Sequence, residues 1–308
     1  THLKVNDNLT LSGIALETGA GSLSLSEALA LTDNASLNSS GGTITLQSGG
    51  SASTGSVVSL PGTTLVLQNP LSLTGATLKT KNTTFTTNAN ALSLSNSSIL
   101  EVEGTQNLGG VFPDNSTTLR LAANSTISDN ASLSVGTLDL ANFALTLNDQ
   151  MAGLNVKQAV TLDAATEQIV SGDADLSLNG GITVSNGILS SSGGDVSASS
   201  LSIGTAGTVN ILGGTLILPA GGTAVSGAAF TTSNAAISLA GTLAVADTWT
   251  SSTNTNLSLT DNASLSSTAP LSLAVLSTNG HDFELANGTT DLTLANSFTL
   301  SSGTLSTQ

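Results

Sequence analysis

Two pairs of acidic residues at alternate positions are the first candidates for chemistry in this 308-residue chain. Glu101 and Glu103 are separated by one residue, as are Asp173 and Asp175, so each pair would share one face of an extended strand. Two carboxylates can hold a cation or act as the acid and base of a glycosidase. A Ca²⁺ site needs about six to eight oxygen ligands, and the nonapeptide calcium repeat is absent from the sequence. We therefore expect these acids to be structural or weak calcium ligands, not catalytic groups.

Three other sites could carry chemistry and are expected not to. The segment 281–284 (His-Asp-Phe-Glu) could ligate a metal, but the only other imidazole, His2, is distant in sequence, so a polar loop is expected. An N-terminal Thr can act as a nucleophile, yet Thr1 lacks a supporting Lys. Trp249, the only indole, is expected to fill a coil edge and not to stack on a ligand. No catalytic residue is predicted.

The composition excludes several classes of partner. The chain has 5 Lys and Arg against 20 Asp and Glu, which gives a formal net charge of -15. So few cations cannot neutralise a nucleic acid or dock the chain on an anionic membrane. Because Cys is absent, disulfides and thiolate metal sites are excluded. The chain also contains no run of about 18 apolar residues, the length that a helix needs to cross a bilayer.

A step of seven residues between apolar or small positions runs along most of the chain, beginning with Leu9, Leu16, Leu23, Ala30, Leu37 and Ile44. A coiled coil also repeats every seven residues, but here the local pattern alternates with period two, as in 23–25, 65–67 and 257–259. Such alternation among Ser and Thr is typical of half-buried strands. The abundant Thr, Ser, Asn and Gly are also poor helix formers. An all-β fold is predicted.

Short strands separated by bends rich in Gly, Asn, Asp and Ser fit a solenoid better than hairpins. The predicted fold is a single-stranded parallel β-helix with about three short strands per coil of roughly 21 residues. Stacked coils would align inward side chains in vertical ladders. One predicted ladder contains Leu16, Leu37 and Val58, and a second contains Leu23, Ile44 and Leu65.

One elongated β-solenoid domain is expected over residues 1–308, because no stretch rich in Pro or charge separates two domains. Three stretches break the rhythm and are expected to be irregular insertions. They lie near 101–115, 148–175 and 277–287. The first is predicted to be a loop between coils, and the second contains a candidate helical turn at 164–168.

Two short elements recur along the chain. Gly-Thr-apolar-x-apolar occurs at 42–46, 136–140, 207–211, 214–218 and 241–245, and Asp-Asn-Ala-Ser-Leu occurs at 33–37, 129–133 and 261–265. Together they resemble the passenger regions of bacterial autotransporters and the filamentous-haemagglutinin-like surface proteins. The resemblance implies a right-handed parallel β-helix that is secreted or displayed on a bacterial cell surface.

Both ends of the chain have strand-like sequence with no amphipathic helix or cluster of charges. Solenoids normally cap their ends, because an open end exposes unpaired backbone. We expect such ends either to stack head to tail into a fibre or to continue into a larger surface protein. The predicted assembly residues are Leu3, Val5, Leu9, Phe298, Leu300 and Leu305.

The expected function is a non-enzymatic extracellular structural protein, either a surface adhesin or a fibre-forming subunit. Its expected partners are further copies of itself or a carbohydrate or other cell-surface ligand, and no cofactor is expected apart from calcium. The alternative is a carbohydrate-acting enzyme or binding module on a pectate-lyase-like β-helix, which seven aromatic residues make a poor match. An ice-binding face is not expected, because Thr43-Ile44-Thr45 has no evident matching row on successive coils.

Overall fold

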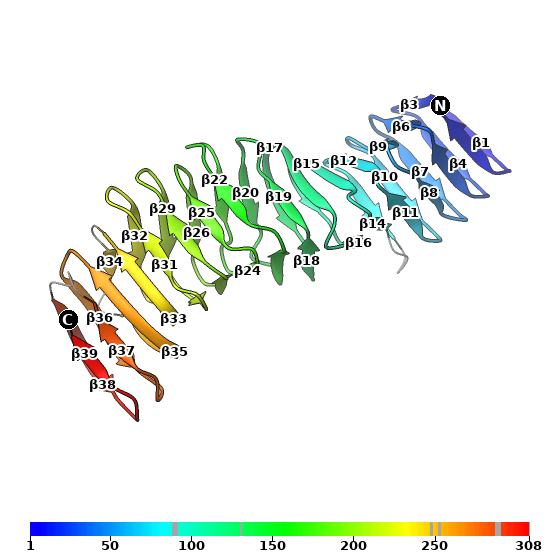
Figure 1. Cartoon of the computed structure of the whole chain (residues 1–308). Coiled ribbons are helices and arrows are strands. Elements are labelled where there is room, and N and C mark those ends of the chain that lie inside the picture. The colour runs from blue at the N-terminus through cyan, green and yellow to red at the C-terminus, as the bar shows by residue number, and fades with distance from the viewer. Residues whose placement is uncertain (88–91, 130, 247–248, 252–253, 287–290, 308) are drawn as a thin grey trace. The chain divides into compact units, whose positions relative to one another are not determined.

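A computed structural model describes residues 1–87, 92–129, 131–246, 249–251, 254–286 and 291–307 (Figure 1). Over these ranges the chain forms 39 strands and no helix. The strands wind into a parallel β-solenoid of about 14 coils, each of about 21 residues, which confirms the predicted fold class. Two compact units can be distinguished, unit 1 (Thr1–Leu145 and Gln150–Ala152) and unit 2 (Thr146–Asp149 and Gly153–Gln308). The single domain and the right-handed coiling stay predictions.

In unit 1 the successive strands alternate among three parallel sheets, whose first members are β1, β2 and β3 (Figure 1). The first sheet contains β1 (His2–Val5), β4 (Ser22–Leu25), β7 (Thr43–Leu46), β10 (Thr64–Leu67) and β13 (Thr84–Thr86). The second contains β2 (Leu9–Ser12), β5 (Leu29–Thr32), β8 (Gly50–Ala52), β11 (Leu71–Thr74), β14 (Leu92–Ser95) and β16 (Val111–Pro113). The third contains β3 (Ala15–Gly19), β6 (Ser36–Ser39), β9 (Val57–Ser59), β12 (Thr77–Lys81), β15 (Ile99–Asn107), β17 (Thr118–Ser128) and β19 (Thr137–Asp139). Unit 1 also contains β18 (Ser132–Val135), and β20 (Ala144–Leu147) includes the unit boundary.

Unit 2 has the same three-sided coil. One series of paired strands contains β21 (Gly153–Val156), β24 (Asp175–Leu178), β27 (Val196–Ala198), β30 (Thr215–Leu218) and the first half of β33 (Ala236–Val245). A second contains β22 (Val160–Leu162), β25 (Ile182–Val184), β28 (Leu201–Ile203), β31 (Gly222–Ala224) and the second half of β33. A third contains β23 (Gln168–Val170), β26 (Ile188–Ser191), β29 (Thr208–Ile211), β32 (Ala229–Thr232) and β34 (Trp249–Ser251). The last coils are built from β35 (Asn256–Ser267), β36 (Leu271–Ser277), β37 (Phe283–Leu285), β38 (Leu292–Thr299) and β39 (Leu305–Thr307).

Inward-facing aliphatic side chains form rows that run from coil to coil. In the first sheet of unit 1, Leu23 lies beside Ile44, and Ile44 lies beside Leu65. All three side chains are at most 1% exposed. The predicted ladder of Leu16, Leu37 and Val58 is also present, in the third sheet. Both predicted ladders are confirmed, and alternate residues along each strand supply the core, because side chains of a strand point to opposite faces.

Backbone groups at a corner of the coil can be paired by a buried polar side chain where no strand backbone pairs with them. Gln106 is 1% exposed. Its Oε1 accepts a hydrogen bond from the backbone N–H of Thr83 at 2.9 Å, and its Nε2 donates to the carbonyl oxygen of Thr83 at 3.0 Å. The side-chain amide thus pairs with both backbone groups of Thr83, which removes the cost of burying them unpaired.

The prediction of an inserted loop at 101–115 is wrong. β15 extends to Asn107 and pairs with β17 along most of its length, and β16 pairs with β14. Acidic residues in this segment suggested a loop, but Glu101 and Glu103 point outward while Val102 between them is fully buried. The outer face of a half-buried strand can carry charged side chains, so the presence of two acidic residues does not distinguish a loop from a strand.

The other two irregular stretches also contain solenoid strands. Residues 148–175 contain β21, β22 and β23. The predicted helical turn at 164–168 is a single hydrogen-bonded turn and not part of a helix, in which the Glu167 backbone N–H donates to the carbonyl oxygen of Ala164 at 2.9 Å. The carboxylate of Glu167 accepts from the backbone N–H of Asp163 at 2.8 Å. In the stretch 277–287, β37 continues the ladder, and Asn287 lies outside the described residues.

Candidate functional site

The first coil exposes one edge of each of its three strands. β1 pairs with β4, β2 with β5 and β3 with β6, and the described residues supply no strand on the opposite side. Leu3 is 48% exposed, whereas Leu23, beside it in the same row, is fully buried. Val5 and Leu9 are half-buried. This coil therefore presents free backbone groups and aliphatic side chains at the same edge.

The last coil has the same properties. β38 pairs with β36 and β39 pairs with β37, again on one side within the described chain. Phe298, Leu300 and Leu305 are 41%, 44% and 45% exposed. Their inward neighbours are buried, since Leu276 lies beside Phe298 and Phe283 lies beside Leu305. The aliphatic rows of the core thus reach an open edge here.

The sequence analysis missed part of both edges. Leu16 in β3 and Leu292 and Leu294 in β38 are half-buried, and each lies beside a buried Leu of the adjacent coil. Leu11 is 5% exposed and lies beside Leu31. Leu11 lies two residues from the predicted Leu9, and Leu16 belongs to a predicted ladder. Leu292 and Leu294 show the period-two alternation of a strand, which is the signal that could have identified them.

The acidic pair Glu101 and Glu103 lies on the outer surface of the third sheet of unit 1, beside two lysines. The register of β12 and β15 places Lys79 beside Glu101 and Lys81 beside Glu103. The Lys79 Nζ lies 3.1 Å from the Glu101 Oε1, and Lys81 forms an ion pair with Glu103. These cations neutralise the two carboxylates that the sequence offered as weak metal ligands.

The same outer row continues with alternating charge. Arg120 of β17 lies beside Glu101 in the register, and Asp139 of β19 lies beside Arg120. The Arg120 Nε donates to the Asp139 Oδ2 at 2.9 Å. Positive and negative side chains therefore follow one another across four coils, an arrangement in which every charge has an opposite charge as a neighbour. The pairs are partly exposed, so each contributes little to stability.

The second acidic pair, Asp173 and Asp175, is exposed in unit 2. The Asp175 Oδ1 accepts a hydrogen bond from the backbone N–H of Asp195 at 2.9 Å, and the Asp195 Oδ1 accepts one from the N–H of Thr215 at 2.7 Å. The carboxylates of Asp175 and Asp195 thus satisfy backbone donors of the next coil, and the backbone N–H of Asp173 donates to the Asp149 Oδ1 at 3.4 Å. Their chemistry in the structure is capping, in the same way that Asn and Asp side chains cap turns.

The segment 281–284 has a similar structural role. The Asp282 Oδ1 accepts hydrogen bonds from the backbone N–H and from the hydroxyl of Thr304, at 2.7 and 2.8 Å. The backbone N–H of Asp282 donates to the Asn262 Oδ1 at 2.9 Å. Among the residues described, no three His, Asp or Glu side chains gather where they could hold a metal ion.

Trp249 is a core residue, as predicted. It is 3% exposed, its ring stacks on Phe230 with centroids 5.2 Å apart, and its Nε1 donates to the hydroxyl of Thr232 at 2.9 Å. A buried indole with a satisfied N–H fills space and cannot stack on an external ligand.

Outward hydroxyl groups of the first sheet are aligned, contrary to expectation. Thr43 lies beside Thr64 and Thr64 beside Thr84, and Thr45 and Thr86 flank Val66 in the next row. The rows were not evident in the sequence because the coil length changes. Thr43 and Thr64 are 21 residues apart, whereas Thr64 and Thr84 are 20 residues apart. The flank of this sheet is a regular surface of small polar side chains.

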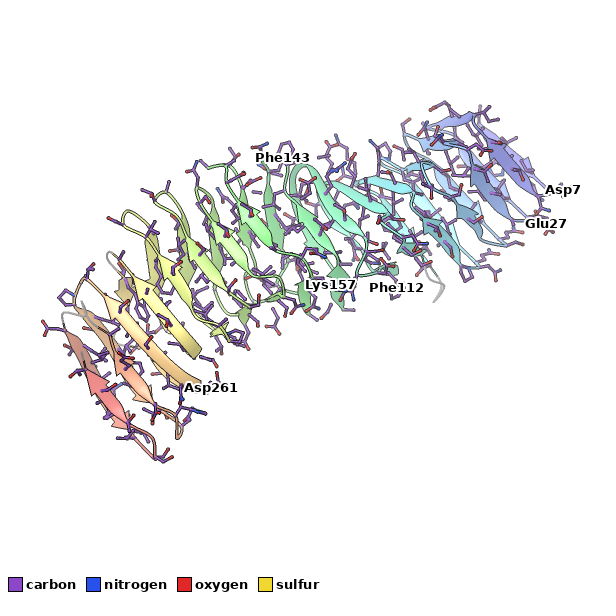
Figure 2. The ribbon with its side chains drawn as sticks, in the orientation of Figure 1. Asp7, Glu27, Phe112, Phe143, Lys157 and Asp261 are labelled. Atoms are coloured by element: carbon purple, nitrogen blue, oxygen red, sulfur yellow. The ribbon has the colours of Figure 1, made fainter. Side chains whose placement is uncertain are left out.

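Two shallow hollows occur on unit 2. One, of about 340 Å³, is lined by Thr, Ala, Val and Ser side chains of β31, β33 and β35 and the residues that follow these strands. The other, of about 360 Å³, includes Asp282 and Glu284. The only aromatic side chain lining it, Phe283, is fully buried, so it offers no face for a sugar to stack on. Phe112, Lys157 and Asp261 are exposed side chains elsewhere on the outer surface, and Phe143 is half-buried (Figure 2).

Comparison of the chain with protein-family models, with curated proteins and with solved structures finds no match. Within the described ranges no helix is long and apolar enough to cross a membrane. The chain is therefore identified as a parallel β-solenoid, in which the first and last described coils have strand partners on one side within this sequence.

Proposed function

We propose that this chain is a non-enzymatic extracellular structural protein, a fibre-forming subunit or surface adhesin that assembles by end-to-end stacking of its coils. The observation that carries the proposal is the pair of open edges. Each presents unpaired strand backbone together with apolar side chains that are 41–48% exposed, among them Leu3, Phe298 and Leu305.

Stacking would remove both kinds of group from water at once. Parallel strands are normally buried and paired on both sides, and an open edge is a template for another strand. A contact between the first coil of one copy and the last coil of the next is heterologous, so it repeats without closing and produces a filament.

The flanks of the solenoid support a structural role outside the cell. Outward positions are mainly Ser, Thr and Asn, and the recurring Gly-Thr and Asp-Asn-Ala-Ser-Leu elements resemble those of bacterial autotransporter passengers and filamentous-haemagglutinin-like proteins. Three of the five Lys and Arg residues form ion pairs, namely Lys79, Lys81 and Arg120. With five Lys and Arg residues in all, the chain offers few sites to a protease of tryptic specificity, which suits a secreted or surface-displayed protein. The resemblance to bacterial surface proteins supports display on a bacterial cell.

Electron microscopy and sedimentation of the purified chain at micromolar concentration, with calcium and with a chelator, test the proposal. We expect filaments one solenoid wide whose length grows with protein concentration and does not depend on calcium, because Lys79 and Lys81 neutralise Glu101 and Glu103. A chain that stays monomeric at all concentrations would overturn the assembly function. Hydrolysis or tight binding of a polysaccharide by that monomer would favour the carbohydrate-acting alternative.

Two variants locate the contact. Phe298→Lys and Leu305→Lys introduce charge at the open edge and should abolish the filaments. Leu212→Lys is the matched control, because Leu212 is 48% exposed but follows β29, in an internal coil of unit 2. Equal loss of assembly in the control would show that the filaments do not form through the coil ends. Because all three side chains are exposed, the variants should retain the thermal midpoint of the monomer.

A further inference from the structure

The first and last coils carry apolar side chains at the same spacing. In the first coil the residues are Leu3, Val5, Leu9, Leu11 and Leu16, with separations of 2, 4, 2 and 5. In the last coil they are Leu292, Leu294, Phe298, Leu300 and Leu305, with the same separations. The internal coil of β10, β11 and β12 has the same separations, at Leu65, Leu67, Leu71, Leu73 and Leu78. In the second coil the corresponding residues are Leu23, Leu25, Leu29, Leu31 and Leu37, and the last separation is 6. The two terminal coils therefore share a spacing that also occurs between stacked coils inside unit 1.

The matched residues occupy equivalent places in their coils. Leu3, Leu9 and Leu16 lie on β1, β2 and β3, one on each side of the coil. In the last coil Leu292 and Phe298 lie in the two halves of β38, which pair with separate parts of β36, and Leu305 lies on β39. Apart from Leu300, which follows β38, each matched residue lies beside a buried apolar residue of the adjacent coil, so these inward rows reach the open edge.

We infer that the partner at each open edge is a second copy of this chain, stacked in a single register in which residue i lies beside residue i + 289 of the next copy. The inference rests on the proposed end-to-end assembly and specifies its geometry. In this register all five apolar residues of one edge meet the five of the other, at the distance of about 4.8 Å between neighbouring strands.

Other registers match fewer residues. Sliding the strands by two residues in either direction leaves two of the five apolar pairs, and places Leu9 beside Asn296 or Leu11 beside Ser302. A copy can also be rotated about the solenoid axis by one side of the coil, so that Leu3 meets Phe298. This register keeps two apolar pairs, because Leu9 then meets Thr304. Because side chains alternate between the two faces, a slip of one residue would turn every inward row outward.

The charged residues agree with the same register. It places His2 beside Asp291, two exposed side chains that can carry opposite charges. Lys4 meets Thr293 and Glu17 meets Ser306, so neither meets a like charge. Asp7, which projects into solvent at the same corner as Glu27 of the next coil (Figure 2), meets Asn296. No described acidic residue of one edge faces an acidic residue of the other.

Disulfide crosslinking of the full chain tests the register directly, because the chain contains no Cys. Lys4→Cys combined with Thr293→Cys places two thiols on neighbouring strands, within the roughly 4.4–6.8 Å between α-carbons that a disulfide requires. Oxidation of assembled protein should give a ladder of covalent multimers on a non-reducing gel. The control pair Lys4→Cys with Ala295→Cys is displaced by two residues and should give at least about tenfold less.

Charge exchange provides an independent test. His2→Asp places two carboxylates side by side, and Asp291→Lys places two groups that can both be positive, so each variant should raise the critical concentration for assembly about two- to fivefold. A mixture of the two variants should assemble at about the wild-type concentration, because Asp at position 2 then meets Lys at position 291. Filaments that crosslink through the control pair, or show no rescue on mixing, would overturn the register and leave the proposed function standing. Absence of filaments would overturn both.

Discussion

An internal coil and a terminal coil of this solenoid have almost the same sequence pattern and very different environments. Leu23 and Leu3 occupy the same inward row on neighbouring strands, yet Leu23 is fully buried and Leu3 is 48% exposed. Along the solenoid axis a coil is only about one side chain thick. Most of the burial of its inward side chains therefore comes from the coils above and below it. A coil of this kind is completed by its neighbours, and its stability is largely a nearest-neighbour property.

The largest contrast is expected between Ile44→Asp and Leu3→Asp. Ile44 is fully buried between two coils, so the variant buries an unpaired carboxylate and should lower the free energy of unfolding by about 3–5 kcal/mol. Leu3→Asp leaves the charge in water at the open edge and should cost less than about 1 kcal/mol in the monomer. Urea denaturation of both variants measures the difference. Equal losses would show that the edge is covered in solution.

A buried aromatic pair sharpens the comparison in unit 2. Trp249→Ala removes a ring that stacks on Phe230 and donates to Thr232, and it should lower the free energy of unfolding by about 3–4 kcal/mol. Phe112→Ala is the matched control, since Phe112 is 57% exposed and its loss should cost less than about 1 kcal/mol. Thermal unfolding followed by circular dichroism distinguishes them, and a similar loss from Phe112→Ala would contradict its exposed position.

Substitution of two glycines distinguishes the cost of backbone strain from the cost of a clash between coils. Gly19 has φ 54° and Gly42 has φ 72°, so a substitution strains both. A β-carbon at Gly42 would lie 2.5 Å from the carbonyl oxygen of Gly21 in the preceding coil, whereas at Gly19 nothing lies within 4 Å. We expect Gly42→Ala to cost about 2 kcal/mol more than Gly19→Ala, as measured by the midpoints of chemical denaturation. Equal midpoints would mean that the coils separate easily at this corner.

The smallest effect is expected from Asp114, an exposed residue after β16. The hydroxyl of Ser116 donates to its Oδ1 at 2.6 Å, and this hydrogen bond is the main cause that holds the pKa of Asp114 below its usual value. Because the pKa is lower in the folded state, the stabilisation is present at neutral pH and is lost as the pH falls below about 4. Asp114→Asn should remove less than about 1 kcal/mol at neutral pH. A stability difference from wild type that does not shrink as the pH is lowered from 7 into the acidic range would contradict this cause.

The alternation of apolar and polar residues was sufficient to predict the strands, the parallel solenoid and the two ladders through Ile44 and Leu37. The preference for Trp249 as a residue that fills a coil edge also agrees with its burial. The loop predicted at 101–115, from two carboxylates, a Pro and a Phe, is wrong because β15 and β16 continue the solenoid there. Lys79 and Lys81 lie about one coil before Glu101 and Glu103, and only the register of β12 and β15 shows that they are paired.

The candidate site could be predicted in part. Leu3, Phe298 and Leu305 followed from the uncapped ends and Leu16 from a predicted ladder, whereas the strand register was needed to assign Leu292 and Leu294 to the last coil. Period-two alternation determined by itself which side chains face inward, because it depends only on residues that are close in sequence. The tertiary structure alone decided which residues are neighbours between coils, because each corner can add or drop a residue. The change from 21 to 20 residues that aligns Thr64 with Thr84 is such a case.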